Sequence, residues 1–228
     1  MENILQLLNL HFQRTNLPLS KPVVIHSCAG AGKTTLIQTI LQNHPSATAY
    51  THSTHYASSR DLAGYNLRPF SQYTPGHLDI IDEYLAGSIP PTACFLFADP
   101  YQYPPTNIRA HYTSLITHRF GPTLAAYLTT LGYHITSSLP AQPTELEFLN
   151  LWDWTPSGTC ITHDEHLRNL LVSHSIPTLR PCEAIGLEFP AVDYVTPSTP
   201  SRATVTHLDY IALTRHTLKL RVITDDTN

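Results

Sequence analysis

The chain contains 228 residues, of which 42% are hydrophobic and 13% are charged, and its formal net charge is −4 at pH 7. The apolar residues suffice to bury a core, which excludes an intrinsically disordered tail, and the length lies between one and two average domains. The slightly acidic balance excludes a protein that coats nucleic acid through bulk positive charge, but leaves binding in a local groove open. Nineteen prolines and nine glycines predict short elements joined by many turns.

The cysteines and the hydropathy pattern predict a soluble, intracellular protein. None of the four cysteines forms a C-x-x-C pair, and their spacing fits neither a zinc ribbon nor a small disulfide scaffold, so reduced thiols are expected. No stretch approaches the roughly 18 apolar residues of a membrane span, and the first residues do not join a basic segment to an apolar run. We therefore expect no direct insertion into a membrane.

The first half of the chain alternates between helical and extended patterns. In chain order the pattern predicts a helix at 2–13, a strand at 22–26, a helix at 35–42 and strands at 78–81 and 93–98. Both later strands end at an acidic residue, as strands do when they deliver side chains to a shared sheet edge.

The second half is less regular but continues the alternation. It predicts a helix at 122–131, an extended segment at 133–137, a helix at 163–173 with Thr162 as its N-cap, and strands at 191–195 and 220–224. Alternation in both halves predicts an α/β fold with parallel sheets. We place a domain boundary near residue 110, giving domains at 1–110 and 111–228.

The strongest motif is the glycine-rich loop between the first strand and the second helix. A phosphate-binding loop needs glycines where the backbone wraps around anionic oxygens, a lysine for the β- and γ-phosphates and a hydroxyl for Mg²⁺. Lys33 and Thr34 supply the last two, while Ser27 replaces the first glycine of the strict pattern. An ordinary glycine turn is the alternative. The residues expected to bind nucleotide are Ser27, Cys28, Ala29, Gly30, Ala31, Gly32, Lys33, Thr34 and Thr35.

An acidic pair follows the strand at 78–81. Asp82 suits a residue that holds Mg²⁺, and Glu83 suits one that polarises the attacking water. Two adjacent carboxylates on a solvated surface are the alternative. Their place after an apolar strand, about fifty residues beyond the loop, favours Mg²⁺-dependent hydrolysis of a nucleotide.

The next strand ends at Asp99, and Gln102 follows three residues later. An amide at this position can report whether the γ-phosphate is intact. A loop-capping role is the alternative for Asp99. Phosphoryl transfer also needs a positive group that stabilises the negative charge developing on the γ-phosphate. Arg119 and Arg215 are the candidates, although each, taken alone, also fits a surface arginine.

The order of these motifs resembles the superfamily 1 helicase core of positive-strand RNA viruses. The small size and the Ala-Leu-Thr-Arg-His ending are similar to the first movement proteins of the triple gene block of plant viruses such as potexviruses and carlaviruses. The resemblance runs from residue 22 to about residue 217. It matches the family's motifs at Gly30, Gly32, Lys33 and Thr34 (I), Asp82 and Glu83 (II), Asp99 and Gln102 (III), Arg119 (IV), Glu183, Gly186 and Phe189 (V), and Thr214 and Arg215 (VI).

Three residues depart from the family pattern. Ser27 and Ala98 replace common glycines, and Ile185 replaces a common glutamine, which we expect to weaken coupling between ATP and RNA. None of the three removes a phosphate or metal ligand. The segment 48–54 occupies the place of motif Ia, which contacts RNA in the family.

The resemblance implies two RecA-like lobes that close on ATP and Mg²⁺, with Arg119 and Arg215 reaching in from a reduced second lobe. It implies ATP-dependent binding of single-stranded viral RNA, NTP hydrolysis, cell-to-cell movement of the genome and suppression of RNA silencing. The implied partners are further copies of the chain, the other two triple gene block proteins, virions and host silencing factors, in the host cytoplasm and at plasmodesmata.

Other interpretations stay open from the sequence. The protein could be a non-motor RNA-binding scaffold and silencing suppressor with a vestigial or regulatory ATPase, or a small nucleotide kinase. Histidines at i+3 spacing, His52 with His55 and His163 with His166, could bind a metal. Trp152 and Trp154 could stack on bases, pack in a core or form a partner surface. Cys28 could be a reactive thiol or a small packing residue.

Overall fold

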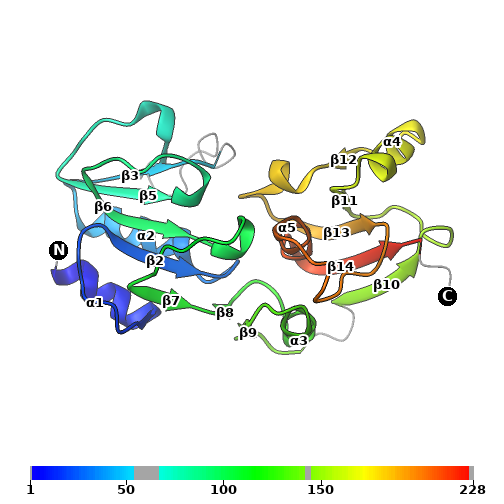
Figure 1. The fold of residues 1–228 in the computed structure, drawn as a ribbon, viewed down its shortest axis with the longest axis horizontal. Helices are drawn as coiled ribbons and strands as arrows, with labels where there is room; N and C mark the ends of the chain where they lie inside the picture. Colours follow the sequence, from blue (N-terminus) through cyan, green and yellow to red (C-terminus); the bar gives the residue numbers. More distant parts are fainter. Residues whose placement is uncertain (1, 54–66, 142–144, 226–228) are drawn as a thin grey trace. The chain divides into compact units, whose positions relative to one another are not determined.

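The computed structural model describes residues 2–53, 67–141 and 145–225 (Figure 1). The chain divides into two compact units, Met1–Leu115 and Ile116–Asn228, which we describe separately as the N-terminal and C-terminal units. The sequence analysis placed the boundary at residue 110.

The N-terminal unit is built on a seven-stranded sheet of order β1-β7-β2-β6-β5-β3-β4. All neighbouring strands in it run parallel except the edge pair β1 and β7. Its elements are α1 (Glu2–His11), β1 (Gln13–Arg14), β2 (Val23–Ser27), α2 (Lys33–Asn43), β3 (Ala47–Thr51), β4 (Leu67–Pro69), η1 (Phe70–Gln72), β5 (Leu78–Asp82), η2 (Tyr84–Ala86), β6 (Ala93–Ala98), η3 (Pro100–Gln102) and β7 (Tyr112–Ser114).

The two faces of this sheet are covered differently. Because side chains alternate along a strand, Ile80 faces α1 and α2, whereas Ile81 faces the opposite side. That second face is covered by side chains from the short 3₁₀ turns and loops, including Tyr84 and Phe70. Within the described residues, helices therefore cover one face only, and the loops that follow the strands lie close to the other.

The C-terminal unit contains a five-stranded, all-parallel sheet of order β10-β14-β13-β11-β12 and a small parallel pair, β8 and β9. Its elements are β8 (Ile116–Thr117), α3 (Pro122–Thr130), β9 (Thr136–Ser137), β10 (Leu146–Asn150), β11 (Thr159–Ile161), α4 (Glu165–Ser173), β12 (Thr178–Leu179), η4 (Pro181–Ala184), β13 (Phe189–Thr196), α5 (His207–Leu213) and β14 (His216–Thr224).

A buried ion pair joins the two central strands of this sheet. Asp193 in β13 lies opposite Arg221 in β14, and the guanidinium bonds both carboxylate oxygens at 2.6 and 2.7 Å. The indole of Trp154 also donates to Asp193, at 3.2 Å, and its ring packs against α4. The packing interpretation of Trp154 is therefore confirmed, because its N–H is held inside the unit. Trp152 is 74% exposed and donates its indole N–H to Asp225.

The α/β fold with parallel sheets predicted from the sequence is confirmed, with local corrections. The helix predicted at 2–13 ends at His11, and Gln13 begins strand β1, which pairs with β7. Helix α4 begins at Glu165, and its N-cap is Asp164, which accepts a hydrogen bond from the Leu167 amide at 2.8 Å. Thr162 was wrong as the cap because its hydroxyl accepts from the Asp164 amide instead. Of the extended segment at 133–137, only β9 is a strand. Among the described helices, none is long and apolar enough to span a membrane.

Candidate nucleotide site

The N-terminal unit gathers the predicted phosphate and metal ligands at one edge of its sheet. Strands β2, β5 and β6 run parallel, so their carboxyl ends meet there (Figure 1). The glycine-rich loop follows β2, Asp82 ends β5, and Asp99 follows β6. Ligand sites in open parallel sheets lie at this edge.

The loop has the backbone that an anion-binding turn requires. Gly30 and Gly32 have φ angles of 76° and 84°, a region that favours glycine. Within the described residues no side chain caps α2, whose first residue is Lys33, so the helix N-terminus presents amides and positive dipole to a ligand. The Lys33 ammonium lies 3.5 Å from the Ser27 carbonyl.

The apolar residues of the loop anchor it to the core. Cys28, Ala29 and Ala31 are all buried, and Cys28 is fully so. The complete burial of Cys28 supports a packing role rather than a reactive thiol, because a reactive thiol must be accessible.

Asp82 is a buried carboxylate with one oxygen ready for a ligand. Its side chain is 2% exposed, and the Thr51 hydroxyl donates to Oδ2 at 3.1 Å. Among the described residues Oδ1 has no hydrogen-bond partner. Burial, and then the charge of Glu83, raises the pKa of Asp82 to about 7, while Lys33 opposes the shift. A buried oxygen without a partner beside a phosphate loop fits Mg²⁺, which binds through one or two protein oxygens plus phosphate and water.

A neutral histidine in the strand before the loop contacts the residue that follows the acidic pair. His26 Nε2 lies 2.7 Å from the hydroxyl of Tyr84, which immediately follows Glu83. Burial, together with the nearby charge of Lys33, lowers the pKa of His26 to about 4. Since His26 is uncharged at neutral pH, it adds no positive charge to the site.

Glu83 adopts a backbone conformation that is unusual for its residue type. Its φ is 51°, in the left-handed region, and its side chain is almost fully buried. Carboxylate oxygen Oε2 accepts a hydrogen bond of 2.9 Å from the hydroxyl of Tyr103. Such a conformation between a strand and a 3₁₀ turn is the kind of backbone outlier that clusters at functional sites.

The turn after β6 is organised by Asp99, which is completely buried. Its Oδ1 accepts from the Tyr101 amide at 3.1 Å and caps η3, while Oδ2 accepts from the Gln102 side-chain amide at 2.9 Å. The capping role that the sequence left open for Asp99 is therefore present. Gln102 is buried as well, and its Oε1 has no partner among the described residues.

The C-terminal unit brings its two candidate arginines together through Thr214. Arg119 donates to the Thr214 carbonyl at 3.0 Å and forms an ion pair with Glu188. Arg215 is 2% exposed and donates to the Thr214 hydroxyl at 3.1 Å. Neither is an ordinary surface arginine, since both guanidinium groups are held by the same short segment.

The remaining family-motif residues of this unit shape the backbone. Glu183 caps the start of η4 by accepting from the Arg180 amide at 2.7 Å. Gly186 has a φ of 84°, and Phe189 begins β13. These residues set the path of the segment that carries Glu188.

Several residues at these sites had no assigned role in the sequence analysis. Thr51 and Tyr103 lay inside segments that were singled out, yet nothing in the local pattern indicates that they bond the acidic pair. Glu145 is buried, accepts from the Gly121 amide and lies 3.5 Å from the His216 imidazole. Although burial acts in the opposite direction, the nearby His216 imidazole and the hydrogen bond from the Gly121 amide lower the pKa of Glu145.

The histidine metal hypothesis finds no support in the described part of the chain. No group of three or more His, Cys, Asp or Glu side chains there could hold a metal ion. Of the histidines considered, His55 lies outside the described residues, as does the end of the motif Ia segment at 48–54. Within that segment, residues up to Thr51 form β3.

Comparison with known proteins agrees with the motif order. Residues 23–224 match the model of the viral superfamily 1 RNA helicase core domain. The movement and silencing protein TGBp1 of Indian citrus ringspot virus is 37% identical over 94% of this chain and 92% of its own length. The proteins of that name from Papaya mosaic potexvirus and White clover mosaic virus are each 36% identical, over 94% and 99% of this chain and 91% and 98% of their own length.

Solved structures share the fold at low sequence identity. The helicase of PRRSV matches with a TM-score of 0.61 at 15% identity, covering 90% of this chain and 52% of that one. An arterivirus nonstructural protein 10 helicase in complex with DNA matches with a TM-score of 0.54 at 18% identity, covering 99% of this chain and 58% of that one. The chain thus spans little more than half the length of these helicases, and the likeness supports the RecA-like fold alone.

Proposed function

Because the chain belongs to the viral superfamily 1 RNA helicases, we propose that it is an ATP-dependent RNA helicase and NTPase that serves as a viral movement protein and silencing suppressor. The observation that carries the enzymatic part is the buried pair Asp82 and Glu83 at the sheet edge that also holds the phosphate loop. The match to the movement and silencing protein TGBp1 of Indian citrus ringspot virus, which covers 92% of that protein, supports the biological part.

In this proposal the N-terminal unit binds the nucleotide. Lys33 and the loop amides hold the β- and γ-phosphates, and Thr34 and Asp82 hold Mg²⁺, which when bound neutralises charge that develops on the phosphates. A bound cation would favour the ionised form of Asp82, because a nearby positive charge stabilises a carboxylate. The pKa of Asp82 near 7 without metal therefore predicts that metal binding releases a proton below that pH.

The remaining side chains complete the hydrolysis step. Glu83 takes a proton from the attacking water, whose other contact is the Gln102 amide beside the γ-phosphate. Arg119 and Arg215 stabilise the charge of the transition state from the C-terminal unit, so turnover requires that the units close on the nucleotide. Closure and opening against bound RNA would then move the strand.

The partners and location follow the relatives. We propose single-stranded viral RNA as the ligand, with self-association and contacts to the other two triple gene block proteins, virions and host silencing factors. The host cytoplasm and plasmodesmata are the places where these partners meet. RNA binding should weaken with salt, because phosphate contacts release counterions.

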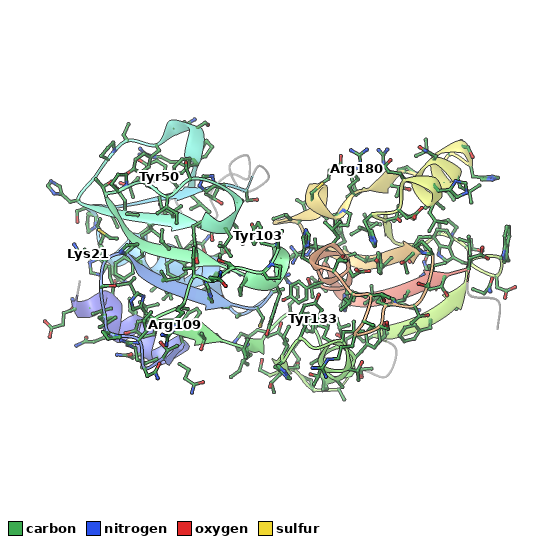
Figure 2. All side chains as sticks on the ribbon, in the orientation of Figure 1. Lys21, Tyr50, Tyr103, Arg109, Tyr133 and Arg180 are labelled. Carbon is green, nitrogen blue, oxygen red and sulfur yellow. The ribbon has the colours of Figure 1, made fainter. Side chains whose placement is uncertain are left out.

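The first test is ATP hydrolysis by the purified chain with and without single-stranded RNA. Lys33→Ala and Glu83→Gln should each remove RNA-stimulated turnover. Lys21→Ala is the matched control: it also removes one lysine charge, but Lys21 lies at the opposite end of the N-terminal sheet from Tyr103 (Figure 2). Turnover that survives both Lys33→Ala and Glu83→Gln would overturn the proposal.

A second candidate is the non-motor scaffold, supported by relatives whose name gives movement and silencing rather than helicase activity. It predicts that RNA binding and self-association are unchanged by Lys33→Ala and that wild-type turnover is negligible. The kinase alternative predicts phosphate transfer to a nucleoside acceptor, which the same assay detects as product other than inorganic phosphate.

A further inference from the structure

Tyr103 lies against the acidic pair, in direct contact with Glu83. It follows η3, at the carboxyl end of β6, where Figure 2 shows its side chain at the edge of the N-terminal unit. Its hydroxyl donates to Glu83 Oε2 at 2.9 Å, and the tyrosine is half-buried. The contact joins residues that are 20 positions apart in the chain.

The hydroxyl stays a donor at every ordinary pH. Burial first, and then the negative charge of Glu83, raises the pKa of Tyr103 well above its usual range. A protonated phenol beside a carboxylate has one favourable arrangement, in which the phenol donates and the carboxylate accepts. This bond therefore limits the positions that the Glu83 carboxylate can take.

Positioning matters more at Glu83 than at an ordinary glutamate. Its φ of 51° places a residue with a side chain in the left-handed region, so the local backbone alone does not favour the observed geometry. A base that abstracts a proton must be held within hydrogen-bond reach of the water, and an error of about 1 Å costs a large part of the rate. One oxygen suffices to accept the proton, so the bond at Oε2 is compatible with that role.

The turn that carries Tyr103 also carries Gln102. Both follow Asp99, which caps η3 and holds the Gln102 amide at 2.9 Å. A shift of this turn on nucleotide binding would move the γ-phosphate sensor and the hydroxyl on Glu83 together. One short turn thus carries both the Tyr103 hydroxyl that contacts Glu83 and the amide that, in the proposed mechanism, contacts the attacking water.

We propose that Tyr103 is a positioning residue for hydrolysis, which holds the Glu83 carboxylate in its productive orientation through the bond to Oε2. The inference rests on the proposed function, because it takes Glu83 as the general base. Tyr103 itself touches neither nucleotide nor water in this mechanism.

The test compares steady-state ATP hydrolysis by the full chain and its Tyr103→Phe variant, which keeps the ring and removes the hydroxyl. We expect kcat to fall roughly ten-fold or more, the usual effect of losing a hydrogen bond to a charged group, with KM for ATP changed less than about two-fold. Tyr73→Phe is the matched control: it removes a phenolic hydrogen bond of 2.8 Å to the carboxylate of Asp79 in the same unit. Its kcat should stay at the wild-type value.

A double-mutant cycle with Glu83→Gln separates positioning from folding. If Tyr103 acts through Glu83, then Tyr103→Phe causes no further loss of the slow residual hydrolysis of Glu83→Gln, measured without RNA in single turnover at high enzyme concentration. Equal losses in both backgrounds, or a Tyr103→Phe kcat equal to wild type while Glu83→Gln is inactive, would overturn the inference and leave the proposed function standing. Wild-type turnover by Glu83→Gln would instead overturn the assignment of the base, and with it both proposals.

Discussion

Replacing Asp82 by Asn should make the nucleotide-free protein more stable relative to wild type as the pH rises, although it removes the proposed Mg²⁺ ligand. The physical reason is that Asp82 is 2% exposed and its charged form is disfavoured by burial and by Glu83. Asparagine has the same shape and can still accept from the Thr51 hydroxyl, but it carries no charge.

The magnitude follows from the pKa. Burial raises the pKa of Asp82 from 3.8 to about 7, so the folded protein holds this proton more tightly than the unfolded chain does. Between these two values the unfolded chain binds fewer protons, and stability therefore falls as the pH rises. At 1.36 kcal/mol per pH unit, the interval between the two pKa values corresponds to a loss of about 4 kcal/mol of folding stability. A comparison between pH 4.5 and pH 8 covers about 3 kcal/mol of that loss.

The assay is urea unfolding followed by far-ultraviolet circular dichroism, in EDTA and without nucleotide, at both pH values. Circular dichroism is needed because both tryptophans lie in the C-terminal unit. Asp79→Asn is the matched control on the same strand. The Asp79 carboxylate accepts hydrogen bonds from Tyr73, Gly76 and Thr92, so its replacement should lower stability rather than raise it.

A free-energy difference between Asp82→Asn and wild type that is the same at both pH values would refute the reasoning. So would a variant whose free energy of unfolding falls relative to that of wild type as the pH rises. Adding Mg²⁺ to a fixed concentration of ADP should then stabilise wild type more than it stabilises Asp82→Asn, since a ligand stabilises the folded form in proportion to how tightly it binds.

Three further outcomes follow from single contacts. Arg221→Leu leaves the buried Asp193 carboxylate without its cation and should lower the free energy of unfolding by roughly 3–5 kcal/mol. Tryptophan fluorescence should show a lower urea midpoint, because Trp154 donates to the same carboxylate. An unchanged midpoint would contradict this. Asp164→Ala removes the cap of α4 and should cost about 1 kcal/mol in the same assay, so full stability would mean that the cap contributes nothing. In Gly32→Ala the new Cβ meets no atom within 4 Å, so the loss of folding stability should come only from backbone strain at a φ of +84°, about 1–2 kcal/mol. ATP should bind more weakly to this variant in a titration. An affinity equal to that of wild type would show that the loop tolerates a side chain at this position.

The sequence by itself predicted the elements whose signals are local. The strand, loop and helix around Lys33 follow from an apolar run, two glycines and a helical pattern, and the structure has all three. The acidic residues after β5 and β6 were placed at one sheet edge for the same reason, since parallel strands deliver their carboxyl ends together. Motif order was enough to identify the helicase family, which the comparisons confirmed.

Tertiary structure alone decided which side chains meet. Arg119 and the Thr214 carbonyl are 95 positions apart, and the Tyr103 hydroxyl reaches Glu83 only because β5 and β6 are neighbours in the sheet. Even the local choice of Asp164 as the cap of α4 depended on where the Thr162 hydroxyl finds its own donor. Hydropathy and turn residues report on neighbours along the chain, whereas these contacts depend on strand order, on register and on the competition among polar groups once they are buried together.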